Sequence, residues 1–275
     1  QDRGAPVAAA LGINAVTTDI GGRPQLRATW SYAAGVLDAE EVGELAQLWV
    51  RALTAVTEAA KQPDVRALTP SDLRLVALDQ TAIDRFEDRY PSLQDIWSLS
   101  PLQSGLLFHA LLAEQSIDSY TVQLTLELVG ADADRMHRAG QALLDRHDNL
   151  RAAFVHDSEG TAVQIVCQNV GLPWEDHDLS KLNQREQENA IAGLLEADRA
   201  RGFDMAVPPL LRFLFLRLGD DRQQLILTNH HILLDGWSMP LVLRDLLTLY
   251  ATDGSSDVLP AVHPYRRYLD WMADR

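Results

Sequence analysis

The sequence predicts an α/β protein of the α+β type, in which a mixed, largely antiparallel sheet is flanked by helices. Residues 120–128 alternate apolar and polar side chains, which is typical of a strand with one buried face. Residues 210–218 and 224–228 are apolar runs on either side of Gly219-Asp220-Asp221, a pattern that predicts a hairpin. Helical spacing is clearest in residues 132–146 and 184–201. Because strands and helices are mixed along the chain, a strictly parallel βαβ architecture is disfavoured.

The remaining elements follow from the same signals. A hairpin is expected at residues 12–18 and 26–32, around Gly21-Gly22. A capping-box sequence at residues 38–41 begins a helix with an apolar stripe that runs to Val56. Ser100-Pro101 starts a further helix, which runs to Leu112. Two more strands are expected at 150–155 and 162–167.

Composition limits the possible functions. The chain has 275 residues, is 47% hydrophobic and carries a formal charge of -15. Such an acidic chain lacks the clustered cations of a nucleic-acid groove, and it has no apolar run long enough for a membrane span. The single cysteine, Cys167, cannot form an internal disulfide, which favours a reducing compartment. We therefore expect a soluble, cytoplasmic protein with neither nucleic acid nor membrane as a partner.

Three parts are predicted along the chain. Residues 1–68 form a hairpin and helix too small to bury both of their faces, and they have no leader-peptide pattern. Residues 69–92 are polar and charged, contain turn sequences, and are interpreted as a linker with one short helix at 80–88. Residues 93–275 form the compact α/β domain. The chain is expected to be a piece of a longer protein.

One segment, residues 229–238 (NHHILLDGWS), is the strongest candidate for a functional site, and we call it the elbow. A buried strand at 225–228 leads to His230 and His231, and Ser238-Met239-Pro240 is a helix start. Gly236, which follows Asp235, allows a sharp turn that exposes a backbone amide. The elbow therefore suits the presentation of an imidazole to a reacting acyl group.

A metal centre is not predicted at this segment. His230 and His231 are adjacent at the end of a strand, so their side chains point to opposite faces, and no other cluster of Cys and His lies nearby. The sequence has no glycine-rich phosphate loop, so neither nucleotide nor flavin is expected.

Four motifs in order resemble the condensation-domain superfamily of nonribosomal peptide synthetases, which includes epimerization domains and is similar in fold to chloramphenicol acetyltransferase. The pattern His230-His231-x-x-x-Asp235-Gly236 matches the active-site motif of that superfamily. The others are SPLQxGLLFH at 100–109, RHDxLRxxF at 146–154 and PYRxYLxW at 264–271. The resemblance covers residues 96–271.

The resemblance implies a domain architecture and partners. Condensation domains are V-shaped pairs of lobes, and residues 93–275 resemble the first lobe, so the second is missing. Residues 1–68 resemble the C-terminal tail of a preceding epimerization or condensation domain. The motif at 103–109 is similar to that of domains with a D-configured donor. Substrates would arrive on 4'-phosphopantetheine arms of upstream and downstream peptidyl carrier domains, with no cofactor held by this domain and no cofactor-binding residue predicted.

The resemblance also implies residue roles. His231 matches the catalytic position, where it either takes the proton of the acceptor amine or holds the amine and stabilises charge. Asp235 is expected to form a structural ion pair with Arg151, in preference to Arg146. The Gly236 amide and the following helix start would supply positive potential near the thioester. His230 is counted with the catalytic set, mainly as a packed, hydrogen-bonded neighbour.

Three alternatives remain open. An epimerization domain would use the same histidine motif to move an α-proton, although the motif at 103–109 disfavours it. A free acyltransferase that uses coenzyme A is less compatible with a flanking tail from another domain. The isolated lobe would instead be a non-catalytic platform for a carrier protein, because a tunnel between two lobes cannot form from one.

Overall fold

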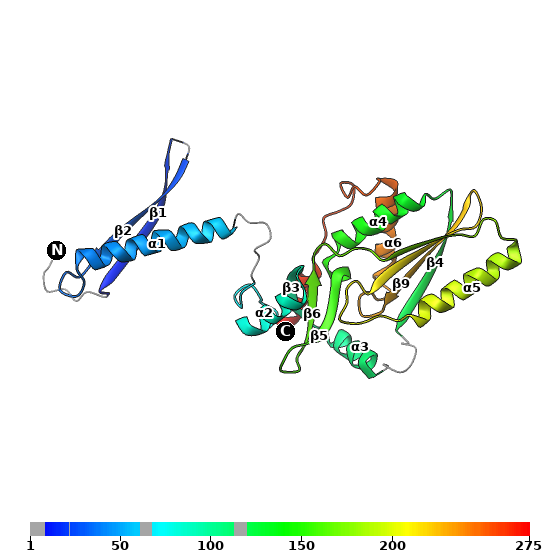
Figure 1. Cartoon of the computed structure of the whole chain (residues 1–275), viewed down its shortest axis with the longest axis horizontal. Coiled ribbons are helices and arrows are strands. Elements are labelled where there is room, and N and C mark those ends of the chain that lie inside the picture. The colour runs from blue at the N-terminus through cyan, green and yellow to red at the C-terminus, as the bar shows by residue number, and fades with distance from the viewer. Residues whose placement is uncertain (1–8, 22, 61–67, 113–119) are drawn as a thin grey trace. The chain divides into compact units, whose positions relative to one another are not determined.

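The computed structural model describes residues 9–21, 23–60, 68–112 and 120–275 (Figure 1). The chain divides into two compact units, Gln1–Arg66 and Ala67–Arg275. The predicted first domain therefore ends two residues earlier than expected, and parts of it, residues 1–8 and 61–67, lie outside the described residues.

The first unit is a hairpin followed by one helix. Strands β1 (Leu11–Ile20) and β2 (Arg23–Tyr32) pair antiparallel, and α1 (Ala39–Ala60) follows. The predicted capping box is present: the Glu41 amide donates to Asp38 Oδ1 at 2.8 Å, and the Asp38 amide donates to Glu41 Oε2 at 3.0 Å. The rings of Trp30 and Trp49 meet edge to face at 6.0 Å, which joins the hairpin to the helix.

The second unit contains two sheets. The larger has the strand order β4-β9-β8-β7, built from β4 (Thr121–Val129), β9 (Arg222–His230), β8 (Leu211–Arg217) and β7 (Trp174–Asp178). Its pairs are antiparallel except β7 with β8, which is parallel. The smaller sheet is antiparallel, with β3 (Leu93–Ser98), β6 (Ala162–Cys167) and β5 (Ala152–His156) in that order. The predicted mixed, largely antiparallel fold with helices is confirmed.

Helices cover both faces of the larger sheet. Alternate residues of β8 point to opposite sides: Phe213 and Phe215 join the main core, whereas Leu214 packs in a second cluster with Leu194 and other residues of α5 (Gln184–Ala200). On the main-core side, α4 (Ala133–Arg146) approaches closely at Gly140, where a Cβ would lie 2.9 Å from the Phe213 ring. Gly140 is therefore required for this packing.

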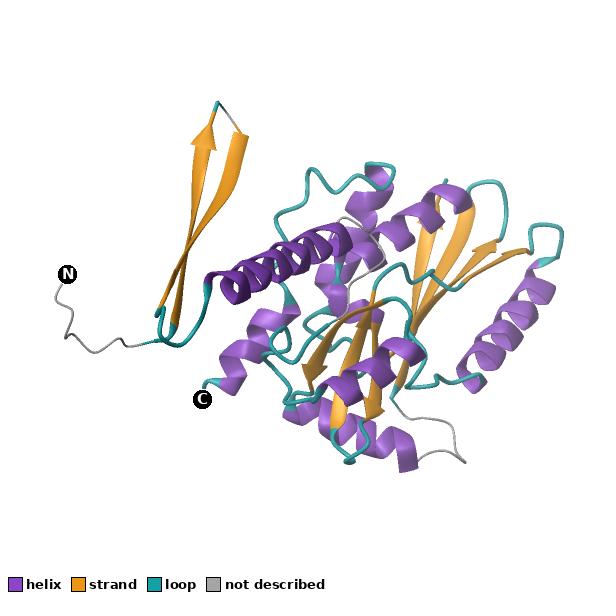
Figure 2. Cartoon of the chain, turned by 60° about the vertical axis from the view of Figure 1, so that its left-hand side comes forward, coloured by secondary structure: helices purple, strands orange, loops and turns teal. Residues whose placement is uncertain are grey.

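Other helical segments of the described part of this unit surround the sheets (Figure 2). They are α3 (Pro101–Leu112), the 3-10 helix η1 (Asp148–Arg151), α6 (Met239–Ala251) and α7 (Tyr265–Ala273). Helix α6 packs on α4, and α7 packs on β3.

The linker interpretation of residues 69–92 is wrong. Helix α2 (Gln80–Arg89) buries Ile83 and Phe86 in the main core, and Leu73 is buried there as well. The Tyr90 hydroxyl donates to the Ala206 carbonyl at 2.9 Å. Although most side chains of this stretch are polar, these apolar ones point inward, so the stretch is part of the folded unit.

Within the described ranges, no helix combines the length and the apolar character needed to cross a membrane.

Candidate functional site

The elbow begins where β9 ends. His230 is the last residue of that strand and pairs in register with Thr121 of β4. The His231 amide donates to the Tyr120 carbonyl at 2.8 Å, and the Leu233 amide then donates to the His230 carbonyl at 3.1 Å. The predicted position of both histidines at a strand end is confirmed, and the chain turns immediately after them.

His230 belongs to the interior. Its side chain is fully buried, and its Nδ1 accepts a hydrogen bond from the Ile232 amide at 3.1 Å. An accepting Nδ1 carries no proton, so a neutral ring bears its proton on Nε2. A ring with no exposed surface cannot touch a substrate, and His230 therefore serves to shape the turn.

His231 lies differently. Its side chain is half-buried, and its Nδ1 is shielded from solvent without a hydrogen-bond partner among the described residues. A buried polar atom normally has a partner, so an imidazole with this spare capacity is a candidate functional group. Because the His231 residue is partly exposed and His230 is fully buried, His231 is the one suited to act on a ligand.

Asp235 organises the start of α6. Its Oδ1 accepts from the Ser238 amide at 2.8 Å and from the Ser238 hydroxyl at 2.7 Å. These hydrogen bonds lower the pKa of the exposed Asp235 carboxyl below its usual value. The helix starts at Met239 with Pro240 in its first turn, as predicted, but the Ser238 hydroxyl bonds to Asp235 and does not cap the helix.

The predicted ion pair between Asp235 and Arg151 is absent from the structure. The Arg151 side chain is buried and donates to the carbonyls of Leu144 (3.0 Å) and Cys167 and to Asp148 Oδ1 (2.5 Å). Arg151 is thus occupied where η1 meets α4 and β6, while Asp235 is occupied by its local turn. The prediction was wrong because each side chain has nearer partners.

Gly236 does not have the predicted conformational role. It is not among the described residues with positive φ, and a Cβ at this position would meet no atom within 4 Å. The residue is exposed, beside the 88% exposed Trp237. Its amide therefore remains a predicted contributor to the site, without a backbone requirement for glycine.

A buried glutamine, Gln103, joins three of the four motifs and was missed from sequence. Its Oε1 accepts from the Ser100 amide at 3.0 Å and from the Tyr265 hydroxyl at 3.3 Å. Its Nε2 donates to the Ile232 carbonyl at 3.3 Å. The available signal was its place in the motif at 100–109, where it was related only to the configuration of the donor.

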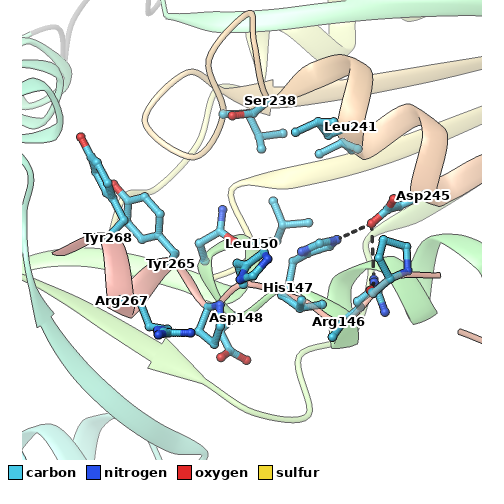
Figure 3. A pocket seen from close by; sticks show the side chains of 18 of the residues that line it. Arg146, His147, Asp148, Leu150, Ser238, Leu241, Asp245, Tyr265, Arg267 and Tyr268 are labelled. Carbon is cyan, nitrogen blue, oxygen red and sulfur yellow. Dashed lines mark hydrogen bonds and ion pairs between the residues drawn. The ribbon is translucent and has the colours of Figure 1, made fainter. Parts of the chain in front are cut away.

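A cavity of about 940 Å³ lies behind the elbow, between α6, η1 and α7 (Figure 3). Leu234 and Ser238 of the elbow line it, but His230 and His231 do not. Its other lining residues include the charged or ionisable side chains of Arg146, His147 and Asp245, and the aromatic rings of Tyr265 and Trp271. The cavity therefore adjoins the candidate site without containing the candidate catalytic ring.

In the part of the chain that the structure describes, no three His, Cys, Asp or Glu side chains are grouped so that they could hold a metal ion.

Comparison with known proteins decides the family. A family model described as "Condensation domain" matches residues 93–275, which is most of the chain. The chain belongs to the condensation-domain family. One of the linear gramicidin synthase proteins of Brevibacillus parabrevis is 35% identical over 277 residues, covering 99% of this chain and 4% of that protein. Bacitracin synthase 1 of Bacillus licheniformis is 31% identical over 210 residues, covering 74% of this chain and 4% of that protein.

Solved structures of other proteins share the fold. The SgcC5 protein of Streptomyces globisporus has a TM-score of 0.53 at 25% identity, covering 64% of this chain and 42% of that one. The EpoB cyclization-docking bidomain of Sorangium cellulosum has a TM-score of 0.57 at 20% identity, covering 95% and 46%. The predicted chloramphenicol-acetyltransferase-like fold is confirmed, and this condensation-domain chain spans less than half the length of those structures.

Proposed function

We propose that this chain is part of a nonribosomal peptide synthetase, in which its condensation domain forms a peptide bond between two carrier-bound thioesters. The donor would be a peptidyl thioester and the acceptor an aminoacyl thioester. The observation that carries the proposal is His231, whose half-buried ring has an unsatisfied Nδ1 among the described residues. Its sequence context, His230-His231-x-x-x-Asp235-Gly236, resembles the family's active-site motif. The 35% identity to the linear gramicidin synthase protein over almost the whole chain supports it.

The bond-forming step requires a neutral amine. As the acceptor nitrogen attacks the thioester carbon, the nitrogen gains positive charge and the carbonyl oxygen gains negative charge. The C–S bond then breaks, and the departing thiolate of the donor arm takes up the proton that the nitrogen loses. His231 acts either by taking the amine proton or by orienting the amine and stabilising its charge. The exposed amide of Gly236 is proposed to face the oxygen, where a donor aimed at developing negative charge accelerates acyl transfer.

The substrates are proposed to be carried by partner domains. Both would hang from 4'-phosphopantetheine arms of upstream and downstream peptidyl carrier domains, with no cofactor held by this domain. The second lobe of the domain is proposed as a further partner, because the chain matches about 42% to 46% of the solved structures' length. We further propose a D-configured donor and an L-configured acceptor, on the motif at 103–109, and a cytoplasmic location.

The first unit is proposed to be the C-terminal tail of a preceding epimerization or condensation domain. It has little core of its own: of its described hydrophobic side chains only Val42 is buried, whereas Leu26, Leu48 and Val56 are more than half exposed. A two-stranded hairpin needs substantial packing to be stable, and α1 adds only one buried hydrophobic side chain among its described residues, so we propose that this unit packs on a partner surface.

One experiment separates the candidate activities. The full-length synthetase is loaded with an α-deuterated donor peptide and an acceptor amino acid, and both carriers are analysed by intact mass. Condensation predicts transfer of the donor to the acceptor carrier, and this transfer should be lost in His231→Ala. Loss of deuterium that requires His231 and is not accompanied by transfer would identify an epimerization domain. The 275-residue chain alone is expected to bind a carrier without turnover, and turnover by that chain would refute the need for a second lobe.

A further inference from the structure

Asp245, in the middle of α6, is a buried carboxylate with three cationic or ionisable partners. It is 3% exposed. Its Oδ2 lies 3.0 Å from His147 Nε2 and 3.4 Å from Arg146 Nε, and its Oδ1 accepts from Arg244 Nη2 at 2.8 Å (Figure 3). Arg146 and His147 close α4, whereas Arg244 shares α6 with Asp245. The contacts with Arg146 and His147 therefore connect two helices.

The protonation states of Asp245 and His147 follow from their burial and from their neighbours. Burial acts to raise the pKa of the Asp245 carboxyl, but hydrogen bonds from Arg244 and His147 outweigh it, so the net pKa is lowered. Burial, together with the neighbouring Arg146, lowers the pKa of His147 despite the opposing effect of Asp245. Near neutral pH, Asp245 is thus ionised, and a neutral His147 donates its Nε2 hydrogen to it.

The cluster lies on the side of α6 that borders a cavity, whereas Leu246 and Leu249 of the same helix are fully buried in the main core. Arg146, His147 and Asp245 line the cavity of about 940 Å³, as do Leu241 and Val242 from the first turns of α6. A helix side that borders a cavity has fewer packed side chains to fix its axial position. The contacts of Asp245 with α4, an ion pair with Arg146 and a hydrogen bond from His147, are a polar constraint on this side of α6.

Movement of α6 would reach the elbow directly. Asp245 follows Ser238 by seven residues, a rise of about 10 Å along a helix. Ser238 is held to Asp235 by two hydrogen bonds, and the Met239 amide donates to the Asp235 carbonyl at 3.2 Å. The elbow is short, so a shift of α6 along its axis changes the backbone that presents His231.

We propose that Asp245 is a positioning residue for His231, acting through Arg146 and His147, which hold α6 and hence the elbow in place. The inference rests on the proposed function of His231. The predicted link between the motif at 146–154 and the elbow, an ion pair of Arg151 with Asp235, is absent. The proposal gives that motif a different link to the elbow, through Arg146 and His147. Asp245 itself touches no substrate in this account.

The test uses Asp245→Asn in the full-length synthetase, with single-turnover peptide transfer as the readout. Displacement of a reacting group by about 1 Å costs up to about 100-fold in rate, and we expect a loss of at least about tenfold, with an unchanged KM for the loaded acceptor carrier. In a His231→Ala background, Asp245→Asn should cause no further loss. A multiplicative loss in that background, or a rate within about twofold of wild type, would overturn the proposal.

Matched variants separate positioning from folding. Arg244→Gln removes the Asp245 partner on the same helix and leaves the contacts with α4, so its transfer rate should stay near that of wild type. His147→Gln keeps an amide donor for Asp245 and should retain most of the rate, whereas His147→Leu should not. Equal rates for these two His147 variants would contradict the proposal even where Asp245→Asn fails to fold.

A second readout does not depend on activity. In the 275-residue chain, the Cε1–Hε1 NMR signal of His231 is assigned by its absence from His231→Ala. We expect Asp245→Asn to shift this signal and Arg244→Gln to leave it in place. An unshifted signal would contradict the inference alone, whereas full transfer activity of His231→Ala would refute the proposed function instead.

Discussion

Gln103 Nε2 donates a hydrogen bond to the carbonyl of Ile232, the residue after His231, across 129 positions of sequence at 3.3 Å. Gln103 Oε1 simultaneously accepts from the Tyr265 hydroxyl of α7. The opening motif, the elbow and the final motif therefore meet at one buried amide. Gln103 therefore holds the elbow from α3, and Asp245 is proposed to hold it through α6.

Replacement of Gln103 by Glu should weaken the hydrogen bonding that holds the elbow in place. The variant keeps Oε1 as an acceptor but removes the donor to Ile232, and it places a carboxylate against that carbonyl. Loss of a buried hydrogen bond with an acceptor left unsatisfied costs about 1–3 kcal/mol. We expect a fall of that size in the free energy of unfolding, measured with urea, together with slower peptide transfer. Tyr265→Phe, which removes only one of the bonds to Oε1, is the control, and an equal or larger loss in that control would contradict the role of the Ile232 bond.

The absence of an Asp235–Arg151 pair leads to a prediction about coupling. Asp235→Asn keeps a side-chain oxygen for the Ser238 turn, so its effect on unfolding free energy should be below about 1 kcal/mol. Arg151→Gln leaves several buried acceptors unsatisfied and should cost at least about 2 kcal/mol. A double-mutant cycle of the two should give a coupling energy below about 0.5 kcal/mol. Coupling above about 1 kcal/mol would show that the two side chains do pair in solution.

Asp198 predicts a specific pH dependence of stability. This buried carboxylate accepts from Arg212 Nε at 2.5 Å, Thr228 Oγ1 at 2.6 Å and Gln123 Nε2 at 2.7 Å. Burial raises its pKa, but these hydrogen bonds outweigh burial and lower it in the folded state. The Asp198 pKa is therefore lower in the folded chain than in the unfolded chain. At a pH above the unfolded-state pKa, the ionised carboxylate stabilises the folded state. This stabilisation is lost as the pH falls through the unfolded-state pKa toward the folded-state pKa.

Asp198→Asn should therefore destabilise the chain near neutral pH and flatten the acid side of its stability profile. Loss of one partner from a buried ion pair costs about 3–5 kcal/mol. Urea unfolding between about pH 7 and about pH 3 measures both effects. Asp253→Asn, which breaks the exposed pair with Arg138, is the control and should leave the stability close to that of wild type. Parallel profiles for wild type and Asp198→Asn would refute the assignment.

The first unit should be protected only in the presence of its neighbour. In the 275-residue chain, amides of β1, β2 and α1 are expected to exchange with deuterium much faster than those of β8 and β9, because the first unit buries so little apolar surface. In the full-length synthetase these amides should become protected. Equal exchange in both proteins would contradict the proposal that this unit is the tail of a preceding domain.

Sequence patterns predicted the hairpin of β8 and β9 because both of its strands are apolar and a short turn joins them. Strand β7 was missed because its residues, WEDHD, are polar and largely exposed at the edge of the sheet, where no alternation develops. Helix α2 was reduced to part of a linker because it contributes only two buried side chains, Ile83 and Phe86. Residue propensity and apolar spacing do not reveal which mostly polar segments pack against the core through a few apolar side chains.

For a similar reason, only some residues of the candidate site were predicted from the sequence. The position of His231 at the end of β9 follows from local pattern, since an apolar strand precedes it and a helix start follows. The partners of Arg151 and the roles of Gln103 and Asp245 depend on contacts between distant parts of the chain, which spacing does not reveal. Asp245 in particular sits in an ordinary helix, where a carboxylate is usually solvated.

The most direct measurement is intact-mass detection of peptide transfer in the full-length synthetase with both carriers loaded, comparing wild type, His231→Ala and His156→Ala. His156 is an exposed histidine on β5 and serves as the matched control. Removal of a catalytic imidazole typically costs about 100-fold or more. We expect His231→Ala to load both carriers normally but to lose transfer by at least that factor, while His156→Ala behaves as wild type. Transfer by His231→Ala at the wild-type rate would contradict the account.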